Sequence, residues 1–367
     1  MLDTFVTGKT MPAVNDRDLA LDFAKGVLII LVIVGHLIQY IIYGGDGFWD
    51  SASFKWIYMF HMPLFMAISG YLSSRALLGK SFTQALRDRA MQLLAPMLFW
   101  CSLLQAAKLA MFPRPPDAPD TVLLVLNDFS GTYWFIWAAF ASFLFVKLVW
   151  AFNPSSPWPL FVSVLLVAFA PVTISVFPLI KYTYPFFCLG FSFAQSRERW
   201  TSIVRSHRPL LMMSTSIAAA LCFMAWRKDT YIYNNLALIH DLQSAKNVLL
   251  MFIGSAAASG MMIAILLRTS RIGSSNRVVR FIATEVGQST LVLYLVQSTV
   301  FRLMDSLPYG ELSDLTTRLA AAGSLGTAII VVALMIRWTV RDIPYLSQLM
   351  LGMPPLSRPL SAQPTHK

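Results

Sequence analysis

The chain has 367 residues, of which 56% are hydrophobic and 13% charged, and its mean hydropathy is +0.61. A soluble domain carries about twice that share of charged residues, so the polar side chains are too few to cover a water-soluble particle. The net charge is +11, and a high positive charge is also typical of nucleic-acid-binding proteins. Here, however, the basic residues gather in alternate loops between apolar segments, as insertion into a membrane predicts. Membrane lipid is therefore an expected partner and nucleic acid is not.

Ten apolar segments of span length follow one another along the chain. They predict an all-α fold, a polytopic integral membrane bundle of about ten transmembrane helices. Pro171, Pro178 and Pro185 interrupt the fifth and sixth segments, which are joined by a very short loop. The predicted spans cover residues 23–43, 54–73, 91–112, 132–152, 158–177, 179–195, 209–226, 247–267, 288–304 and 319–338.

The loops between these spans alternate in charge. Loops 74–90, 196–208 and 268–287 each hold four Lys or Arg residues, whereas 44–53, 113–131 and 305–318 hold one or none and 227–246 holds three. The positive-inside rule then places the basic loops and both termini in the cytoplasm. The predicted organisation is a cytoplasmic N-terminal segment (1–22), a transmembrane domain (23–338) and a cytoplasmic C-terminal tail (339–367).

The first predicted span is expected to be retained in the mature protein. Several charged residues precede Phe23, and the apolar run that begins there is long enough to cross a bilayer. A secretory signal peptide instead has a short basic region, a shorter apolar run and a small-residue cleavage site.

Ionisable residues inside membrane spans are costly and rare, so each one is a functional candidate by default. Five of them are cations that lie near predicted span ends or in the uncertain turn at Pro178. The ordinary interpretation is structural: the side chains near span ends extend to the membrane interface, and Lys181 has a structural place in the turn. The candidates are Lys25, His36, His61, Lys108, Lys147, Lys181 and Arg302.

His36 and His61 each lie seven residues from the outer end of their span. At 1.5 Å per residue, both are about 10 Å below that boundary. Consecutive helices joined by a short loop are neighbours, so we expect the two imidazoles to meet at one depth. Imidazole titrates near neutral pH and acts as a general base. The alternative is a pair of neutral histidines hydrogen-bonded within the bundle.

Lys25 precedes His36 by eleven residues, about 16 Å along a helix. A cation near the cytoplasmic boundary would then share a helix with a base deep in the membrane. Asp22 and Arg17 add polarity to the same end. This spacing suits a long substrate with an anionic head in the cytosol and a reactive tip in the membrane, such as an acyl-CoA thioester.

Several segments resemble a known family of integral membrane enzymes. Residues 22–36, from Asp22 to His36, resemble the first-span signature of the acyltransferase 3 family, in which ten residues separate a basic residue from a histidine. Residues 60–71, FHMPLFMAISGY, are similar to its second-span motif. Residues 134–137, 184–190 and 287–296 resemble three further recurring elements. The matches are most similar to the fucose 4-O-acetylase-like branch, which includes rhizobial nodulation-factor O-acetyltransferases.

The chain departs from this pattern at two positions. Gln297 stands where the family often has histidine, and Gln92 stands where relatives often have a second arginine near Arg89. Both changes remove a titratable or cationic group, which puts a role for these positions in doubt.

The resemblance implies a multi-pass protein of the bacterial inner membrane that transfers an acetyl group from acetyl-CoA to a carbohydrate hydroxyl. The acceptor would be a carbohydrate or glycolipid, such as a nodulation lipo-chitooligosaccharide or an exopolysaccharide, and no metal is expected. His36 would be the base, and His61 would orient it, stabilise the oxyanion or bind substrate. The remaining candidates are Lys25, Arg17 and Arg89 for the CoA phosphates, and Asp22, Ser69 and Trp134 in supporting roles.

For Ser69 and for the aromatic residues near span ends, a purely structural role is an alternative to a functional one. Ser69 follows His61 by eight residues and is expected either to face the same cavity or to pack against a neighbouring helix beside Gly70. Aromatic residues near span ends suggest sugar stacking, but the ordinary interpretation is an interfacial belt. They are Trp49, Trp56, Tyr133, Trp134, Trp158 and Trp200.

Two other functions fit parts of the pattern. A proton-coupled transporter or flippase would use the histidines as a relay, but it needs acidic coupling residues, and no Asp or Glu lies well inside a predicted span. A membrane scaffold or sensor would not require a basic residue and two histidines in this arrangement. For the enzyme, direct attack on the thioester and an acyl-histidine intermediate both remain open.

Overall fold

A computed structural model describes residues 18–111, 121–152, 158–239, 241–305 and 314–353, and these segments contain helices and no strand. The all-α prediction is confirmed for this part of the chain. The α-helices are α1 (Leu19–Leu37), α2 (Ala52–Gly79), α3 (Phe82–Met111), α4 (Thr121–Gly131), α5 (Trp134–Phe152), α6 (Trp158–Phe169), α7 (Phe177–Gln195), α8 (Arg197–Ser206), α9 (Arg208–Ala225), α10 (Leu242–Ile272), α11 (Arg277–Phe281), α12 (Thr290–Met304), α13 (Leu315–Val340) and α14 (Pro344–Leu351). Short π or 3-10 segments are η1 (Ile38–Ile42), η2 (Phe48–Asp50), η3 (Lys228–Thr230), η4 (Ile232–Asn234) and η5 (Ile282–Val286).

Six described helices are both long enough and apolar enough to cross a membrane, and a seventh span results if α11–η5 and α12 are taken together. The number of about ten spans is therefore not confirmed. Two predicted spans correspond to α2 and α7, which are long enough but are not among the six. These helices pack against each other inside the bundle. A helix covered by protein does not need a continuous apolar surface, so hydropathy alone ranks it poorly.

The predicted span over residues 158–177 is wrong in its extent. Helix α6 ends at Phe169, two residues before Pro171, and the chain is not helical again until Phe177. The ring of a proline disfavours helical backbone in the residue before it, which accounts for the stop.

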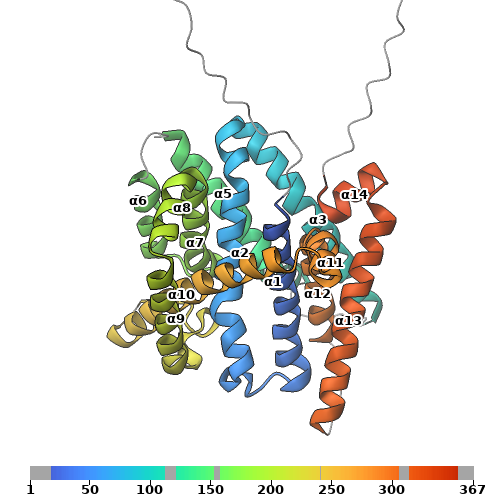
Figure 1. Cartoon of the computed structure of the whole chain (residues 1–367). Coiled ribbons are helices and arrows are strands. Elements are labelled where there is room, and N and C mark those ends of the chain that lie inside the picture. Colours follow the sequence, from blue (N-terminus) through green and yellow to red (C-terminus); the bar gives the residue numbers. More distant parts are fainter. Residues whose placement is uncertain (1–17, 112–120, 153–157, 240, 306–313, 354–367) are drawn as a thin grey trace, which may run out of the picture.

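Figure 1 shows α1 and α2 side by side at the centre, with α6 to α9 on one side and α13 and α14 on the other. The α2–α3 turn and α14 lie at the upper end of this view. The α1–α2 connection and the start of α13 lie at the lower end. The α2–α3 turn and the α1–α2 connection therefore mark opposite ends of the bundle.

Helices α2 and α7 touch through two glycines. A Cβ at Gly70 of α2 would overlap the backbone carbonyl of Phe187, and a Cβ at Gly190 of α7 would overlap that of Ala67. Small residues let membrane helices approach until their backbones touch. This contact fixes α2, and with it the side chains that α2 presents to the interior.

We expect Gly70→Ala to lower the free energy of unfolding of the detergent-purified protein by about 1–3 kcal/mol, and with it the melting temperature. The added methyl group meets backbone, which cannot rotate away as a side chain can. The measurement is the melting temperature by intrinsic fluorescence. Gly79→Ala is the control, since a Cβ there meets no described atom within 4 Å. Equal melting temperatures for the Gly70 variant and the wild type would contradict the prediction.

Candidate active site

Two adjoining cavities lie between α1, α2 and α12. The histidine cavity has a volume of about 450 Å³ and is lined by His36, His61 and a set of aromatic side chains. The arginine cavity has a volume of about 360 Å³ and is lined by Arg89, Lys25 and Ser69 among others. The two cavities share three lining residues, and we call these the throat: Val32, Met62 and Tyr294.

The cavities extend toward opposite ends of the bundle. The lining of the histidine cavity includes Trp49 in the α1–α2 connection, and the lining of the arginine cavity includes Lys80 in the α2–α3 turn. Those two connections lie at opposite ends of the molecule (Figure 1). The shared residues Val32, Met62 and Tyr294 thus lie between a cavity that extends toward one end and a cavity that extends toward the other.

His36 lies in the last turn of α1, where its ring packs against Phe301 at 5.2 Å and Tyr40 at 6.1 Å between centroids. Its Nδ1 is buried and has no hydrogen-bond partner among the described residues. A buried polar atom without a partner is costly, and such atoms in native structures call for an explanation. The His36 side chain lines the histidine cavity, whereas this nitrogen is enclosed by protein.

His61 is almost fully buried in α2, and its ring packs edge-on against Tyr58 at 4.6 Å. Its Nδ1 lies 2.7 Å from the carbonyl oxygen of Ile57. A carbonyl only accepts, so Nδ1 carries a proton, which in the neutral ring leaves Nε2 with its lone pair. The structure brings His36 and His61 into one cavity, as their matched depth predicts, while the chemical role of each stays a prediction.

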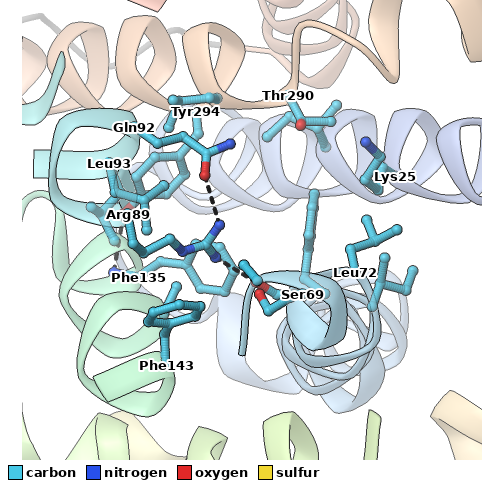
Figure 2. Close-up of a pocket in the computed structure, with 18 of the residues that line it drawn as sticks. Lys25, Ser69, Leu72, Arg89, Gln92, Leu93, Phe135, Phe143, Thr290 and Tyr294 are labelled. Carbon is cyan, nitrogen blue, oxygen red and sulfur yellow. Dashed lines mark hydrogen bonds between the residues drawn. The ribbon is translucent and has the colours of Figure 1, made fainter. Parts of the chain in front are cut away.

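Arg89 of α3 reaches into the arginine cavity from the side opposite Lys25 (Figure 2). Its guanidinium donates to Ser69 Oγ at 3.3 Å and to Gln92 Oε1 at 2.9 Å, and it lies over the ring of Phe143 at 5.4 Å. Its Nε has no acceptor among the described residues. The guanidinium is thus oriented by its neighbours and lines the cavity, while its Nε is enclosed by protein.

The structure distinguishes the position of Ser69 from that of its neighbour Gly70. Gly70 makes the close contact with α7, whereas Ser69 lines the arginine cavity and accepts from Arg89. It does not line the histidine cavity, so it does not face the same cavity as His61. Gln92, where the family often has a second arginine, also contacts Arg89 and lines the cavity.

Lys25 forms an ion pair with Asp22 one turn earlier on α1, with 2.7 Å between Nζ and the carboxylate. The carboxylate holds the ammonium at the edge of the arginine cavity, where Lys25 is part of the lining. Arg17, the third cation expected there, lies outside the described residues.

Aromatic side chains form much of the wall of the histidine cavity. Trp134 is among them and packs edge-on against Tyr233 at 6.1 Å. Trp49 also lines the cavity, so Trp49 and Trp134 both lie where stacking on a sugar ring requires them. Trp158 and Trp200 are exposed as a belt requires, but Tyr133 is fully buried and hydrogen-bonded to Thr299.

An ionic network lies beside the mouth of the histidine cavity. Asp128 of α4 accepts from Lys108, Gln105 and Arg302, and Arg302 also pairs with Asp305. Burial works against ionisation of Asp128, but the three hydrogen bonds outweigh it and hold the pKa of this carboxyl below its ordinary value. The network joins α3, α4 and α12 next to the cavity.

The cations near span ends therefore have protein partners. Lys108 and Arg302 bind Asp128, and Lys147 donates to the carbonyl oxygens of Leu77 and Lys80 at 2.7 Å. Lys147 thus caps the C-terminus of α2, where the helix dipole favours a cation. Lys181 donates to the carbonyl of Ala170.

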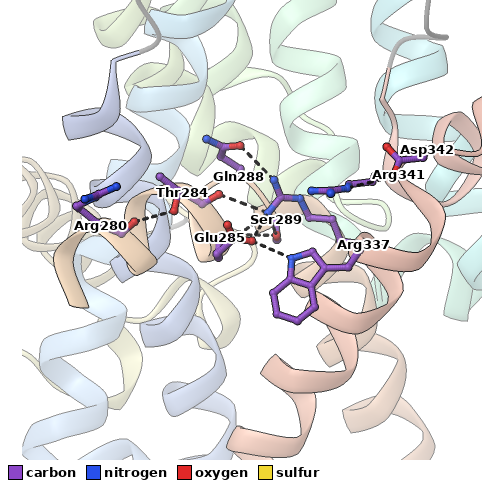
Figure 3. Close-up of polar contacts among 9 residues, drawn as sticks. Arg280, Thr284, Glu285, Gln288, Ser289, Arg337, Arg341 and Asp342 are labelled. Atoms are coloured by element: carbon purple, nitrogen blue, oxygen red, sulfur yellow. Dashed lines mark hydrogen bonds and ion pairs between the residues drawn. The ribbon is translucent and has the colours of Figure 1, made fainter. Parts of the chain in front are cut away.

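A buried arginine fixes the break between η5 and α12 (Figure 3). Arg337 of α13 donates to the backbone carbonyls of Thr284 and Glu285, to the carboxylate of Glu285 at 3.3 Å and to Gln288 Oε1 at 3.1 Å. On its other side the break touches α1, since a Cβ at Gly287 would overlap the carbonyl oxygen of Asp22. The chain bends by 76° here.

The break between η5 and α12 determines where the first turn of α12 lies. Thr290 and Leu291 begin α12 and line the arginine cavity. Arg337 was not among the candidates predicted from the sequence, although it is an ionisable residue within the predicted span 319–338. Tyr294, which lies in the segment 287–296 that resembles a family element, and Asp128, which lies between two predicted spans, were not among them either.

Comparison with known proteins identifies the family. A model described as an acyltransferase domain matches residues 18–338. The chain belongs to the acyltransferase 3 family. It is 53% identical over 357 residues to the nodulation protein NolL of Mesorhizobium japonicum, covering 97% of this chain and 96% of that protein. It is 51% identical over 348 residues to NolL of Sinorhizobium fredii, covering 95% of each. No solved structure matches significantly.

The family and the apolar helices together make this chain a multi-pass integral membrane acyltransferase. The prediction of an acyltransferase enzyme of this family, related to nodulation proteins, is confirmed.

Proposed function

We propose that the chain is an O-acetyltransferase of the bacterial inner membrane that moves an acetyl group from cytosolic acetyl-CoA to a hydroxyl of a nodulation lipo-chitooligosaccharide. Two relatives that match almost the whole chain are named nodulation proteins, which supports this acceptor class. The observation that carries the proposal is the pair of cavities that meet at the throat, with cations on one side and the histidines on the other.

The arginine cavity suits the donor. Arg89 and Lys25 provide two cations in the lining, and a guanidinium and an ammonium both bind phosphate groups. The basic segment 74–90 comprises the end of α2, the α2–α3 turn and the start of α3 beside this cavity, which supports a cytosolic entrance. In this pose the acyl-pantetheine arm extends from the cations toward the throat.

The histidine cavity suits the acceptor. Aromatic faces such as Trp49 and Trp134 offer apolar contact to a sugar ring, while Asn127 and Asn234 offer amide hydrogen bonds. A sugar hydroxyl is a weak nucleophile at neutral pH and needs a base to take its proton as it attacks the thioester. His36 is the proposed base, and His61, with Nδ1 held by Ile57, supports the acceptor or the base from the facing helix.

The test is acetyl transfer by the purified protein in liposomes. Acetyl-CoA labelled in the acetyl group is supplied with a lipo-chitooligosaccharide, with an exopolysaccharide oligosaccharide, or with no acceptor. We expect label on a sugar of the lipo-chitooligosaccharide, with the added acetyl mass located by fragmentation. Transfer to the exopolysaccharide alone would contradict the acceptor class. Movement of glycan across the vesicle wall without acetyl transfer would contradict the enzyme and favour a transporter.

Label retained on the protein when no acceptor is present would indicate an acyl-histidine intermediate. If rapid quenching finds no labelled protein, the direct route is favoured.

A further inference from the structure

The throat contains one hydroxyl group. Val32 of α1 and Met62 of α2 present apolar side chains, whereas Tyr294 of α12 presents a phenol. Any acyl group that passes from the arginine cavity toward the histidine cavity contacts these three side chains. Tyr294 is thus the throat residue that can donate a hydrogen bond to a carbonyl oxygen.

Backbone groups at the start of α5 hold the Tyr294 hydroxyl in place. The amide N–H of Phe135 donates to the phenol oxygen at 3.3 Å, and the carbonyl oxygen of Thr132 lies 3.5 Å from it. The first contact occupies a lone pair and positions the oxygen. The second is at the outer limit of hydrogen-bond distance, and the Ser298 side chain is a further hydrogen-bond partner. An acyl carbonyl oxygen in the throat would accept the hydrogen bond of this hydroxyl in place of these partners.

The throat adjoins both histidines along the chain. Val32 precedes His36 by one turn of α1, about 6 Å along the helix axis, and Met62 follows His61 directly. His36, His61 and Tyr294 also line the same cavity, so two imidazoles and a phenol reach it from three helices. The proposed function requires the same grouping of a base and an oxyanion donor.

We propose that Tyr294 is a catalytic residue that donates a hydrogen bond to the thioester carbonyl oxygen as the acceptor hydroxyl adds to it; this inference rests on the proposed function. In the direct route, the sugar oxygen bonds to the carbonyl carbon while its proton passes to His36. The carbonyl π electrons move to oxygen, and Tyr294 stabilises that oxyanion. When C=O re-forms, the C–S bond breaks and the thiolate takes the proton from His36.

The test is Tyr294→Phe, which keeps the ring and removes the hydroxyl. Loss of one oxyanion donor lowers kcat by about 10²–10³-fold, and we expect a fall in that range with both KM values within about twofold of the wild type. Tyr184→Phe is the matched control, since Tyr184 is a fully buried tyrosine that bonds Ser163 and lines neither cavity. Melting temperatures report whether each variant is folded.

Wild-type activity combined with an unchanged kcat in Tyr294→Phe would overturn this inference and leave the proposed function intact. A raised KM with unchanged kcat would also overturn it, since that result indicates ground-state binding. A wild type that transfers no acetyl group would overturn the proposed function, and this inference with it. If Tyr294→Phe does not fold, fluorotyrosine at position 294 keeps the phenol and makes its O–H more acidic. We then expect a changed kcat, and an identical kcat would overturn the inference.

Discussion

Replacing His36 with alanine is expected to lower kcat for acetyl transfer by about 10²–10⁴-fold, the usual contribution of a positioned general base. The ring lies in the cavity proposed for the acceptor, and its buried Nδ1 has no protein partner among the described residues. The loss should appear in kcat more than in the KM for acetyl-CoA, because the arginine cavity is the proposed binding site of that substrate. Steady-state kinetics with varied donor and acceptor measures both.

The matched control is His207→Ala, which removes an exposed histidine between α8 and α9. It should leave kcat unchanged. Added imidazole should restore part of the activity of the His36 variant if a base is what was lost. Robust transfer by folded His36→Ala protein would exclude His36 as the base and shift attention to His61, whose Nδ1 contact with Ile57 leaves Nε2 available.

Replacing Arg89 with glutamine is expected to raise the KM for acetyl-CoA by about 10- to 100-fold, with a smaller change in kcat. Hydrogen bonds to charged groups contribute about 1.5–3 kcal/mol, and about 1.4 kcal/mol corresponds to a tenfold change in binding. Arg89 is the guanidinium in the arginine cavity, and it is oriented there by Ser69 and Gln92. Kinetics at varied acetyl-CoA and isothermal titration with CoA both measure the effect.

Arg87→Gln is the control on the same helix, because Arg87 is exposed and does not line the cavity. The two variants lose the same charge, so a difference between them reports position and not net charge. Arg89→Lys should recover only part of the affinity, since a lysine keeps the charge but not the guanidinium fork. If Arg89→Gln bound CoA as the wild type does, the arginine cavity would not be the donor site.

The sequence predicted much of the candidate site because that part follows from periodicity and depth along single helices. His36 and His61 lie at one depth in consecutive helices, and the structure places both in one cavity. Lys25 lies eleven residues earlier on α1 and lines the adjoining cavity. The approximate positions of most helices also follow from hydropathy, which reports the exposure of a segment to lipid.

Other features depend on contacts between segments far apart in the sequence. Arg89 and Ser69 are twenty residues apart and on different helices. Tyr294 acquires its place through the backbone of Phe135, 159 residues away. No local sequence pattern predicts contacts between residues so far apart in the chain. From the sequence, Tyr294 was therefore only one residue of a motif.

By itself, the sequence determined that this protein is an all-helical membrane acyltransferase with two histidines at matched depth. Composition and 3.6-residue periodicity act locally, and they are enough for the helical membrane fold. The acyltransferase activity was indicated by the resemblance of several segments to a known family. Only the tertiary structure decided that Ser69 faces the arginine cavity while Gly70 meets α7, that α2 and α7 are interior helices, and that two cavities share the residues of the throat. Those features depend on which helix covers which, and packing of the whole chain sets that arrangement.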